Sequence, residues 1–436
     1  MSRNCISLRR QLIDQVSSHY FDLITKGDFK KAFEYLTNTN LINIDDIGES
    51  KVLLNLLDPL VQNLSVLDQN SQSLVLTVTG STYAALSEYR KALDLYEKAL
   101  EISRQIGDKQ GEGNTLRKMG SVYTALGIYR KALDLNEKSL EISRQIEDKR
   151  GEGNTLRNMG VAYDSLGEYR KALDIYEKAL EISRQIEDKR GEGNSLRNMG
   201  KAYSALGENQ KALDLYEKSL KIAQQIGDIG GECHTLRNIG NVYYDRGEFR
   251  KALDLYEKVL KIAQQIGDIN CEGMALIGMG NSYTSLDEYQ KAIDLYEKTL
   301  KIVQQIGDIR SEGVALVDMG TAYHQLGDYK KAIDLYEKGL KIVQQIGDIR
   351  SEGMALIDMG LAYDQLDDYK KAIDLYEKGL KIAQQIGDIY CEGITRRNLG
   401  FTYRRIGKMN ISRKYLNEAK QIFKNLDLPD MIDSFE

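Results

Sequence analysis

Residues 151–190 read GEGNTLRNMGVAYDSLGEYRKALDIYEKALEISRQIEDKR, and similar blocks of the same length follow one another through most of the 436-residue chain. A glycine keeps its place in each block and recurs every 40 residues from Gly80 to Gly400. A fixed period of about 20 to 50 residues is typical of stacked supersecondary units, because each unit buries its apolar face only against its neighbours. The period therefore predicts an elongated repeat array that offers a binding surface.

Within the quoted block, apolar residues recur with the period of an α-helix in two segments. The first segment, roughly residues 151–165, places Leu156, Met159 and Tyr163 on one side. The second, roughly residues 168–186, carries an apolar stripe that includes Ala172 and Tyr176. Because only the short link Leu-Gly-Glu separates the segments, the block predicts an antiparallel pair of helices.

Glycine and aspartate mark the turn from one block to the next. In the link Ile-Gly-Asp, at residues 226–228 for example, glycine suits the left-handed residue that ends a helix and aspartate suits the cap of the next helix. Glu147 and Glu187 replace this glycine in two of the links. A left-handed residue that carries a side chain costs about 1 kcal/mol, so we expect a different turn at these two joints.

The residues that recur in phase resemble the signature of the tetratricopeptide repeat. In the quoted block they are Leu156, Gly160, Tyr163, Ala172, Tyr176 and Ala179. The block length is similar to that of the subclass found in kinesin light chains and in Pins/LGN-type adaptors. This resemblance implies an all-α fold, a right-handed superhelical solenoid of antiparallel helix pairs. It also implies that an extended peptide segment binds along the concave side, which the first helices line.

The period divides the chain into three parts. Residues 73–426 are expected to form nine tandem repeats, and residues 427–436 a C-terminal tail. Residues 1–72 depart from the period, and we interpret them as an irregular helical cap that covers the first repeat. Within this cap, the dipeptide Asp58-Pro59 is expected to begin a helix.

The composition disfavours several classes of partner. Charged residues make up 29% of the chain with both signs interleaved, and the net charge is −5, so no long-range field attracts nucleic acid. No stretch approaches the roughly 18 apolar residues of a membrane span, and the segment MSRNCISLRRQLIDQ lacks the pattern of a secretory signal. The four cysteines lie far apart without a CxxC pair, which favours free thiols. We therefore expect a cytoplasmic protein without nucleic-acid or membrane partners.

The chain offers no motif for catalysis, a metal or a cofactor. The three histidines lack metal-site spacing, and the neighbours Cys233 and His234 point in different directions on a helix. Gly-Glu-Gly at residues 151–153 lacks the strand and the order of a phosphate loop. We therefore expect that the protein is not an enzyme and uses neither a cofactor nor a metal.

Specificity is expected on the face of each first helix opposite its buried stripe. In blocks two to five this face carries asparagine and arginine in register, and in later blocks it is apolar with acidic edges. An asparagine amide can pair with any extended backbone, whereas arginine offers a forked donor to carboxylates. The predicted peptide-binding residues are Asn114, Arg117, Asn154, Arg157, Asn158, Asn194, Arg197, Asn198, Arg237 and Asn238, with Met354 and Ile357 in the apolar part.

These features favour a scaffold or adaptor that binds an extended segment of a partner protein, with an acidic part, in its concave groove. The alternative from another class is a regulatory subunit or peptide sensor that acts in trans on a signalling or protease-like enzyme. Two further interpretations stay open. The polar face can be merely solvated after recent duplication of the block, and contact between two copies can bury the apolar face.

Overall fold

The computed structural model describes residues 19–39, 50–426, 428 and 431. Helices dominate these residues, and no strand occurs among them, which confirms the expected all-α class. The chain divides into two compact units, which are described separately. Unit 1 consists of residues 1–282 and 301–308, and unit 2 consists of residues 283–300 and 309–436.

The helices alternate between two sets, which we call inner helices (the first of each pair) and outer helices (the second). The inner helices of unit 1 are α4 (Gln69–Ala85), α6 (Lys109–Ala125), α8 (Lys149–Ser165), α10 (Lys189–Ala205) and α12 (Ile229–Asp245). Its outer helices are α5 (Tyr89–Gln105), α7 (Tyr129–Gln145), α9 (Tyr169–Gln185), α11 (Asn209–Ile226) and α13 (Phe249–Ile266). The helices α14 (Ile269–Ser285) and α15 (Tyr289–Ile306) each contribute residues to both units.

Unit 2 continues the same alternation. Its inner helices are α16 (Ile309–Gln325), α18 (Ile349–Gln365) and α20 (Ile389–Arg405). Its outer helices are α17 (Tyr329–Ile346), α19 (Tyr369–Ile386) and α21 (Met409–Asn425). The helix bounds agree with the two segments that the sequence predicts for each block.

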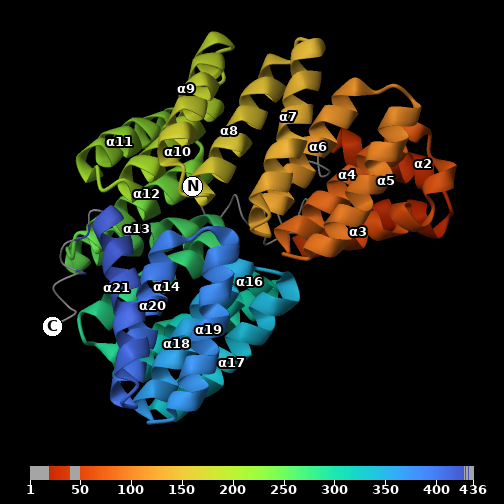
Figure 1. Cartoon of the computed structure of the whole chain (residues 1–436). Coiled ribbons are helices and arrows are strands. Elements are labelled where there is room, and N and C mark those ends of the chain that lie inside the picture. Colours follow the sequence, from red (N-terminus) through yellow and green to blue (C-terminus); the bar gives the residue numbers. More distant parts are fainter. Residues whose placement is uncertain (1–18, 40–49, 427, 429–430, 432–436) are drawn as a thin grey trace. The chain divides into compact units, whose positions relative to one another are not determined.

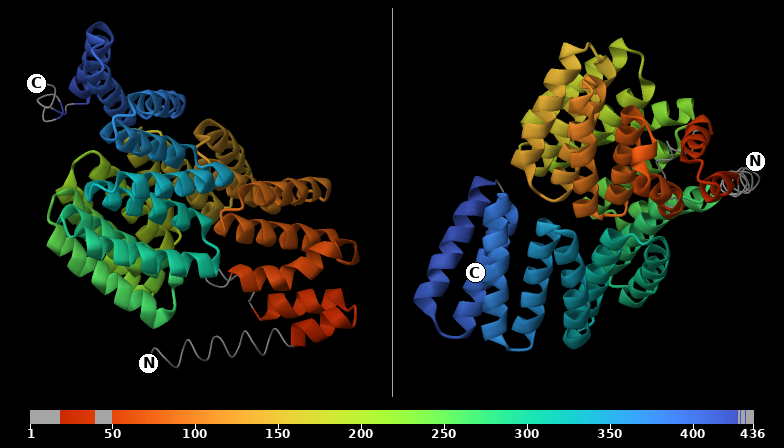
Figure 2. Two further views of the ribbon diagram at one scale, coloured as in Figure 1. Left: turned by 90° about the horizontal axis from the view of Figure 1, so that it is seen from below. Right: turned by 90° about the vertical axis from the view of Figure 1, so that its right-hand side faces the viewer.

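Successive pairs stack side by side in each unit (Figures 1 and 2). Each inner helix packs against its own outer helix and also contacts the inner helix of the next pair, as α6 does with α8 and α16 with α18. Because neighbouring inner helices lie this close together, they line the concave side of each unit. We call their free surface the inner face. The helix-pair solenoid expected from the sequence is confirmed.

The glycine that marks the phase lies where the two helices of a pair touch. A Cβ atom on Gly160 would meet the ring of Tyr176 at 2.3 Å, so only glycine leaves room for that ring. The tyrosines of this position are almost fully buried; they are Tyr96, Tyr176, Tyr216, Tyr256, Tyr296, Tyr336 and Tyr376. The repeated Gly–Tyr contact thus fixes how close each outer helix comes to its inner helix.

The joints between pairs use one turn throughout, including the two that lack glycine. Glu147 and Glu187 adopt left-handed φ angles of 57° and 55°. The expectation of a different turn at these joints is therefore wrong. The surrounding hydrogen bonds explain the result, because the Asp148 N–H still donates to the Ser143 carbonyl at 2.8 Å and Asp148 still caps the Gly151 N–H at 2.9 Å. These bonds hold the glutamate in the conformation that glycine adopts elsewhere.

Among the described residues, three helical segments and a short 3-10 turn precede the first pair: residues 19–25, α2 (Phe29–Asn38), α3 (Ser50–Gln62) and η3 (Leu64–Val66). Leu36 of α2, Leu57 of α3 and Val75 of α4 share one buried cluster. Pro59 lies inside α3, so the expectation that it begins a helix is wrong. Residues 1–18 and 40–49 of the predicted cap, and most of the predicted tail, lie outside the described residues.

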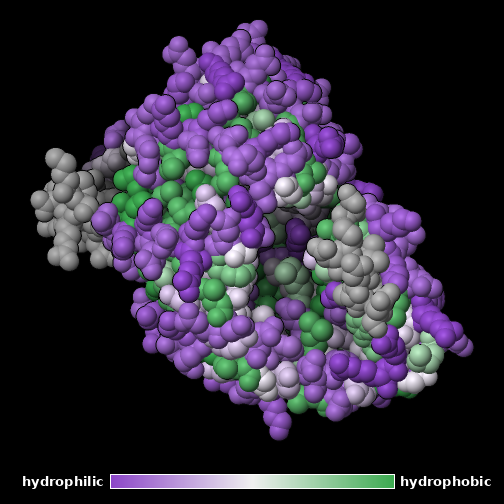
Figure 3. Space-filling model, turned by 90° about the vertical axis from the view of Figure 1, so that its left-hand side faces the viewer, coloured by the Kyte–Doolittle hydropathy of each residue, from purple (hydrophilic) through white to green (hydrophobic). Residues whose placement is uncertain are grey.

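Hydrophilic side chains cover most of the surface drawn in Figure 3, with apolar residues in small groups. Within the described part of the chain, none of the helices combines the length and the apolar character needed to cross a membrane.

Candidate functional site

The inner face of unit 1 carries a row of paired asparagine and arginine side chains. The pairs lie one helical turn apart and are Asn114–Arg117 on α6, Asn154–Arg157 on α8 and Asn194–Arg197 on α10. In each pair the arginine guanidinium donates to the asparagine Oδ1, at 2.8 Å between Arg197 and Asn194. These contacts within a helix hold the guanidinium groups in a fixed position with donors left over, since a guanidinium has five N–H groups.

The arginines of this row are half-buried, since each inner helix packs between its neighbours. Burial lowers the pKa of Arg157 and of Arg197 from the ordinary arginine value. Arginine nevertheless keeps its charge in proteins, because its unperturbed pKa lies above about 12. A fixed charge that has lost part of its water binds an anion more strongly than a fully solvated charge does.

The residue after each arginine forms a second row that connects neighbouring inner helices. Asn158 donates through Nδ2 to the Ser121 hydroxyl of α6 at 2.7 Å, and Lys118 donates to Ser81 of α4 at 2.8 Å. Asn198 and Asn238, the next members, make no hydrogen bond to another described residue. Their amides are therefore available to a ligand on the inner face.

Two hollows lie along these rows. The first, of about 200 Å³, lies between α6, α7 and α8 and is lined by Asn114, Arg117 and Asn154 together with Ser139 of α7 and Asp148 of the joint. Three predicted residues from two repeats thus come together at one concavity.

The second hollow, of about 520 Å³, lies between α10 and α12. It is lined by four of the predicted residues: Arg197, Asn198, Arg237 and Asn238. Its lining also contains Lys201, Ser204, Ala205, Tyr216, His234, Asn241 and Asp245, which lie outside the predicted set.

Helical spacing places some of these additional residues on the same face as the predicted ones. Lys201 and Asn241 follow Asn198 and Asn238 by three residues, which places them on the same helix face. Asp245 follows Asn241 by one further turn. The sequence did not indicate that Tyr216 borders the hollow, because tyrosine recurs at this position in most blocks and is therefore expected in the core. It is indeed 2% exposed and yet borders the hollow.

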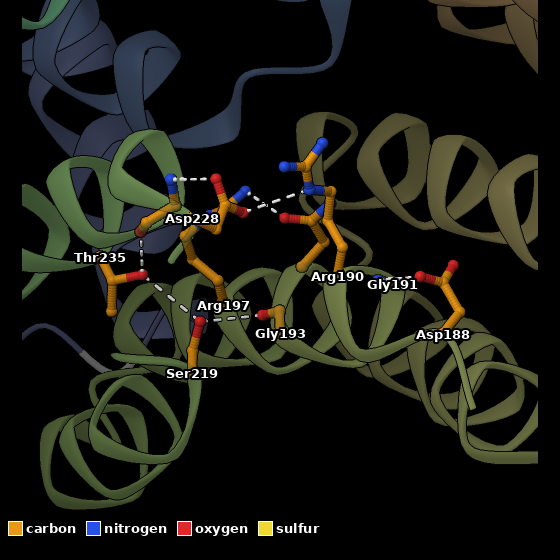
Figure 4. Close-up of polar contacts among 10 residues, drawn as sticks. Asp188, Arg190, Gly191, Gly193, Arg197, Ser219, Asp228 and Thr235 are labelled. Carbon is orange, nitrogen blue, oxygen red and sulfur yellow. Dashed lines mark hydrogen bonds and ion pairs between the residues drawn. The ribbon is translucent and has the colours of Figure 1, made fainter. Parts of the chain in front are cut away.

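The joints beside the hollow position the inner helices (Figure 4). Asp228 accepts a hydrogen bond from the Gly231 N–H at 3.1 Å and pairs with Arg190 of the preceding inner helix at 3.5 Å. Ser219 of the outer helix α11 donates to the Gly193 carbonyl at 2.9 Å. These bonds tie α10, α11 and α12 together, so the rows on the inner face keep a fixed spacing.

Met354 and Ile357, the predicted apolar residues, lie on α18 in unit 2 and have different environments. Met354 is 49% exposed, whereas Ile357 is 6% exposed and packs in a buried cluster with Tyr376 and Leu399. The expectation that the Ile357 side chain is exposed on the peptide-binding face is therefore wrong. A glycine in the outer helix explains the burial, because a Cβ on Gly379 would meet Ile357 Cγ1 at 2.8 Å.

The inner face of unit 2 also carries two carboxyl groups, Asp318 on α16 and Asp358 on α18. Burial, and then the negative charge of Asp318, raise the pKa of Asp358 from 3.8 to about 7. The helices α16 and α18 therefore carry carboxyl groups on this face, in contrast to the arginine row of unit 1, and α20 carries Arg397.

No group of three or more histidine, cysteine, aspartate or glutamate side chains that could hold a metal occurs among the described residues. Burial, followed by the charges of Arg237 and Arg197, lowers the pKa of His234 to about 4. This imidazole is therefore neutral at pH 7. Cys233 and Cys271 lie in one buried apolar cluster, consistent with a packing role.

The stacked helix pairs, with glycine at the contact inside each pair, define a helical-repeat solenoid. The family model described as Tetratricopeptide repeat matches residues 74–145, 112–185, 151–225, 231–305 and 311–385. The chain belongs to this family, whose fold is typically a non-catalytic scaffold that binds proteins or peptides.

Several solved structures share the fold at low sequence identity. A Rap protein complexed with Competence and Sporulation Factor is 15% identical, with a TM-score of 0.56, over 78% of this chain and 99% of that chain. The apo quorum sensor NprR from B. thuringiensis is 16% identical, with a TM-score of 0.53, over 78% and 97% of the two chains. Aspartyl phosphate phosphatase F from Bacillus subtilis is 16% identical, with a TM-score of 0.52, over 85% and 94%. No curated protein matches the chain.

Proposed function

We propose that the inner face of α6, α8, α10 and α12 binds an extended segment of a partner protein. The observation that carries this proposal is the row of asparagine–arginine pairs that runs across three inner helices to the hollow between α10 and α12. Neighbouring repeats present the same groups at regular intervals, which suits a ligand that is itself extended and regular.

The chemistry of the row favours a peptide with acidic side chains. Each asparagine amide has both a donor and an acceptor, so it can pair with a peptide backbone whatever its sequence. The spare N–H groups of Arg117, Arg157 and Arg197 favour carboxylates through charge-assisted hydrogen bonds. The proposal therefore describes a cytoplasmic, non-catalytic adaptor for an acidic segment.

A random-peptide display selection on the immobilised full chain tests the proposal. We expect selected peptides to be enriched in aspartate and glutamate and to bind less tightly at high salt, because salt screens charge pairs. Substitution of Arg157, Arg197 and Arg237 by glutamate should weaken binding by at least tenfold.

The matched control reverses three exposed arginines on the outer helices of the same unit, Arg130, Arg170 and Arg250. This variant has the same net charge as the triple inner variant, and we expect it to bind like the wild type. Equal losses in the two variants would contradict binding at the inner face.

The sensor alternative uses the same face and differs in its consequence. The quorum sensor NprR shares the fold. Small-angle scattering of the chain with a selected peptide separates the two functions. A changed profile on binding favours a sensor, and an unchanged profile favours a scaffold.

A further inference from the structure

The recurring tyrosine of the outer helices separates neighbouring inner helices. A Cβ atom on Gly240 of α12 would meet the Tyr256 ring at 2.8 Å, and a Cβ atom on Gly278 of α14 would meet the same ring at 2.8 Å. The ring, which belongs to α13, therefore stands between the inner helices on either side of it. Since a protein interior is close-packed, this ring sets how near the two inner helices come.

The outer helix α7 lacks this ring. Asn136 stands where α5 has Tyr96 and α9 has Tyr176, and each of the other outer helices from α5 to α19 has tyrosine there. The Asn136 side chain is fully buried, and its Nδ2 donates to the Ala132 carbonyl of its own helix at 2.9 Å. Its buried Oδ1 makes no hydrogen bond to a described residue. Because the amide turns back onto α7, it fills less of the space between α6 and α8 than a tyrosine ring would.

The inner helices α6 and α8 lie closer together at this step of the array. The contact of α6 with α8 is more extensive than that of α4 with α6 or of α10 with α12. In other pairs the tyrosine hydroxyl donates to a side chain of its own inner helix, as Tyr256 does to Asn241 at 2.6 Å. The corresponding residue of α6 is Ser121, which accepts a hydrogen bond from Asn158 of α8 at 2.7 Å. The two inner helices are thus joined directly at the level where a ring separates other inner helices.

The neighbouring step, between α4 and α6, keeps its ring. There Tyr96 donates to Ser81 of α4 at 3.1 Å, and the long Lys118 side chain of α6 also reaches Ser81, at 2.8 Å. The Asn158 side chain is much shorter than lysine. It reaches Ser121 of the preceding inner helix because α6 and α8 lie closer together than α4 and α6 do.

The groove between two neighbouring inner helices, which we call a furrow, differs at the step between α10 and α12. Tyr216 is present there and borders the hollow of about 520 Å³. Lys201 and Asn238 also line this hollow, and they correspond to Ser121 and Asn158, which join α6 to α8. The smaller hollow beside α6 and α8 lies nearer the N-terminal ends of these helices. At the same level of the inner face, the furrow is therefore open where the ring is present and closed where Asn136 replaces it.

We propose that Asn136 determines which side chains of the partner segment fit on the inner face, by narrowing the furrow between α6 and α8. The segment has a small residue, such as glycine, alanine or serine, where it crosses this furrow, and its bulky residue enters the hollow between α10 and α12. A larger side chain over the closed furrow would force the packed helices apart, which is costly. Asn136 acts through the spacing of α6 and α8 and is therefore a positioning residue. This inference rests on the proposed function and adds the size of side chain that each step accepts.

Two reciprocal substitutions in the full chain test the inference. Asn136→Tyr restores the ring, and we expect it to separate α6 from α8 to the spacing of α10 and α12. Tyr216→Asn removes a ring, and we expect it to bring α10 and α12 closer together. Crystal structures of the wild type and of the variants measure both spacings. The matched control is Asn136→Ala, which removes the amide without adding a ring and should keep the wild-type spacing of α6 and α8.

Peptide affinities provide the functional readout. The probe is a display-selected acidic peptide in which each position is replaced in turn by alanine and by tryptophan. At the position over α6 and α8, we expect the tryptophan peptide to bind the wild type about tenfold more weakly than the alanine peptide, and Asn136→Tyr to remove most of this difference. At the position over α10 and α12, the wild type should accept tryptophan, and Tyr216→Asn should weaken the binding of that peptide by about tenfold.

The inference is overturned if Asn136→Tyr leaves the spacing of α6 and α8 unchanged, or if Asn136→Ala changes this spacing as Asn136→Tyr does. Thermal unfolding reports whether each variant folds. If Tyr216→Asn does not fold, Asn136→Tyr decides the outcome, because it introduces the residue that the other pairs carry at this position.

Hydrogen exchange separates a failure of this inference from a failure of the proposed function. A peptide that protects only the outer helices from exchange would refute the proposed function. A peptide that protects α6 and α8, but whose preference for alanine or tryptophan is the same in Asn136→Tyr and the wild type at every position, would refute only the inference about Asn136.

Discussion

The inner helices α8 and α10 of unit 1 and α16 and α18 of unit 2 use one helix position for opposite purposes. At the position of Arg157 and Arg197, α16 and α18 have Val317 and Ile357, whereas α20 has Arg397. The arginines are half-buried on the inner face, whereas Ile357 is buried beside Gly379 of the outer helix. The corresponding outer-helix residue is Ala179 beside Arg157. At Ile357 the glycine of the outer helix leaves room for the side chain to enter the core, whereas Val317 beside Gly339 stays partly buried.

The largest expected effect comes from placing arginine at the core position of unit 2. Ile357→Arg should destabilise α18 and α19 by roughly 3 kcal/mol or more, because it buries a cation without a partner. Arg157→Ile should change the stability of α8 by no more than about 1 kcal/mol, since it removes a half-buried charge. Hydrogen exchange measured helix by helix determines both effects.

An asparagine three residues earlier, as in the row of unit 1, should partly restore the stability of the Ile357→Arg variant. Adding Met354→Asn to Ile357→Arg supplies the oxygen that Asn154 offers to Arg157, and we expect it to recover about 1 kcal/mol. Similar losses for Ile357→Arg and Arg157→Ile, or no recovery in the double variant, would show that the two positions are equivalent.

A smaller effect should appear in the pH dependence of the two faces. The pKa of Asp358 is about 7 in the folded chain against an ordinary 3.8, so folding favours its protonated form. The stability that this group permits is full below about pH 4 and is lost as the pH rises through 7; between pH 5.5 and pH 8 the loss is about 2 kcal/mol. Exchange of α18 amides, corrected for the intrinsic rate, should therefore indicate easier opening at pH 8 than at pH 5.5. Asp358→Asn should remove the difference.

His234 should give unit 1 the opposite dependence. Its pKa is about 4 in the folded chain against an ordinary 6.5, so folding favours the neutral form. The opening free energy of α12 should then decrease as the pH falls from 6.5 to 4, and His234→Asn should flatten this trend. If the opening free energies of α12 and α18 change in the same direction with pH, the two faces do not differ in the way that these pKa shifts predict.

The smallest effect concerns the joints. Glu147→Gly and Glu187→Gly should each stabilise unit 1 by about 1 kcal/mol, because glycine adopts a left-handed φ without a side-chain penalty. In unit 2, where Gly387 has a φ of 73°, Gly387→Ala should have the opposite sign and a similar size. Thermal unfolding of the four proteins, wild type included, measures these changes. If Glu147→Gly leaves the stability unchanged, the surrounding hydrogen bonds remove the cost of a left-handed φ at this glutamate.

The sequence was sufficient for the fold because one local rule repeats. The contact of Gly160 with Tyr176 recurs in phase, so the helix pairs and their bounds follow from the period. The joints at Glu147 and Glu187 were not predictable from residue preference alone. There, the hydrogen bonds of a turn shared with the other joints outweigh the preference for glycine.

The candidate site was predictable in unit 1 and only partly in unit 2. Helical spacing places Asn194 and Arg197 on one face, and the structure pairs them. Ile357 was misplaced because its environment depends on Gly379, which lies on another helix and whose effect appears only in three dimensions. The absence of a carbonyl partner for Arg237 follows from the sequence, since His234 stands at the position of Asn194, whereas its contact with Met274 of the next inner helix appears only in the structure.

The most direct measurement is a hydrogen-exchange footprint of the full chain with a display-selected acidic peptide. The central claim is that the arginine row of unit 1 binds the partner segment. It predicts slower exchange in α6, α8, α10 and α12, with α16, α18 and α20 unchanged, and loss of this protection when Arg157, Arg197 and Arg237 are replaced by glutamate. Protection confined to the outer helices or to the inner helices of unit 2 would contradict the claim.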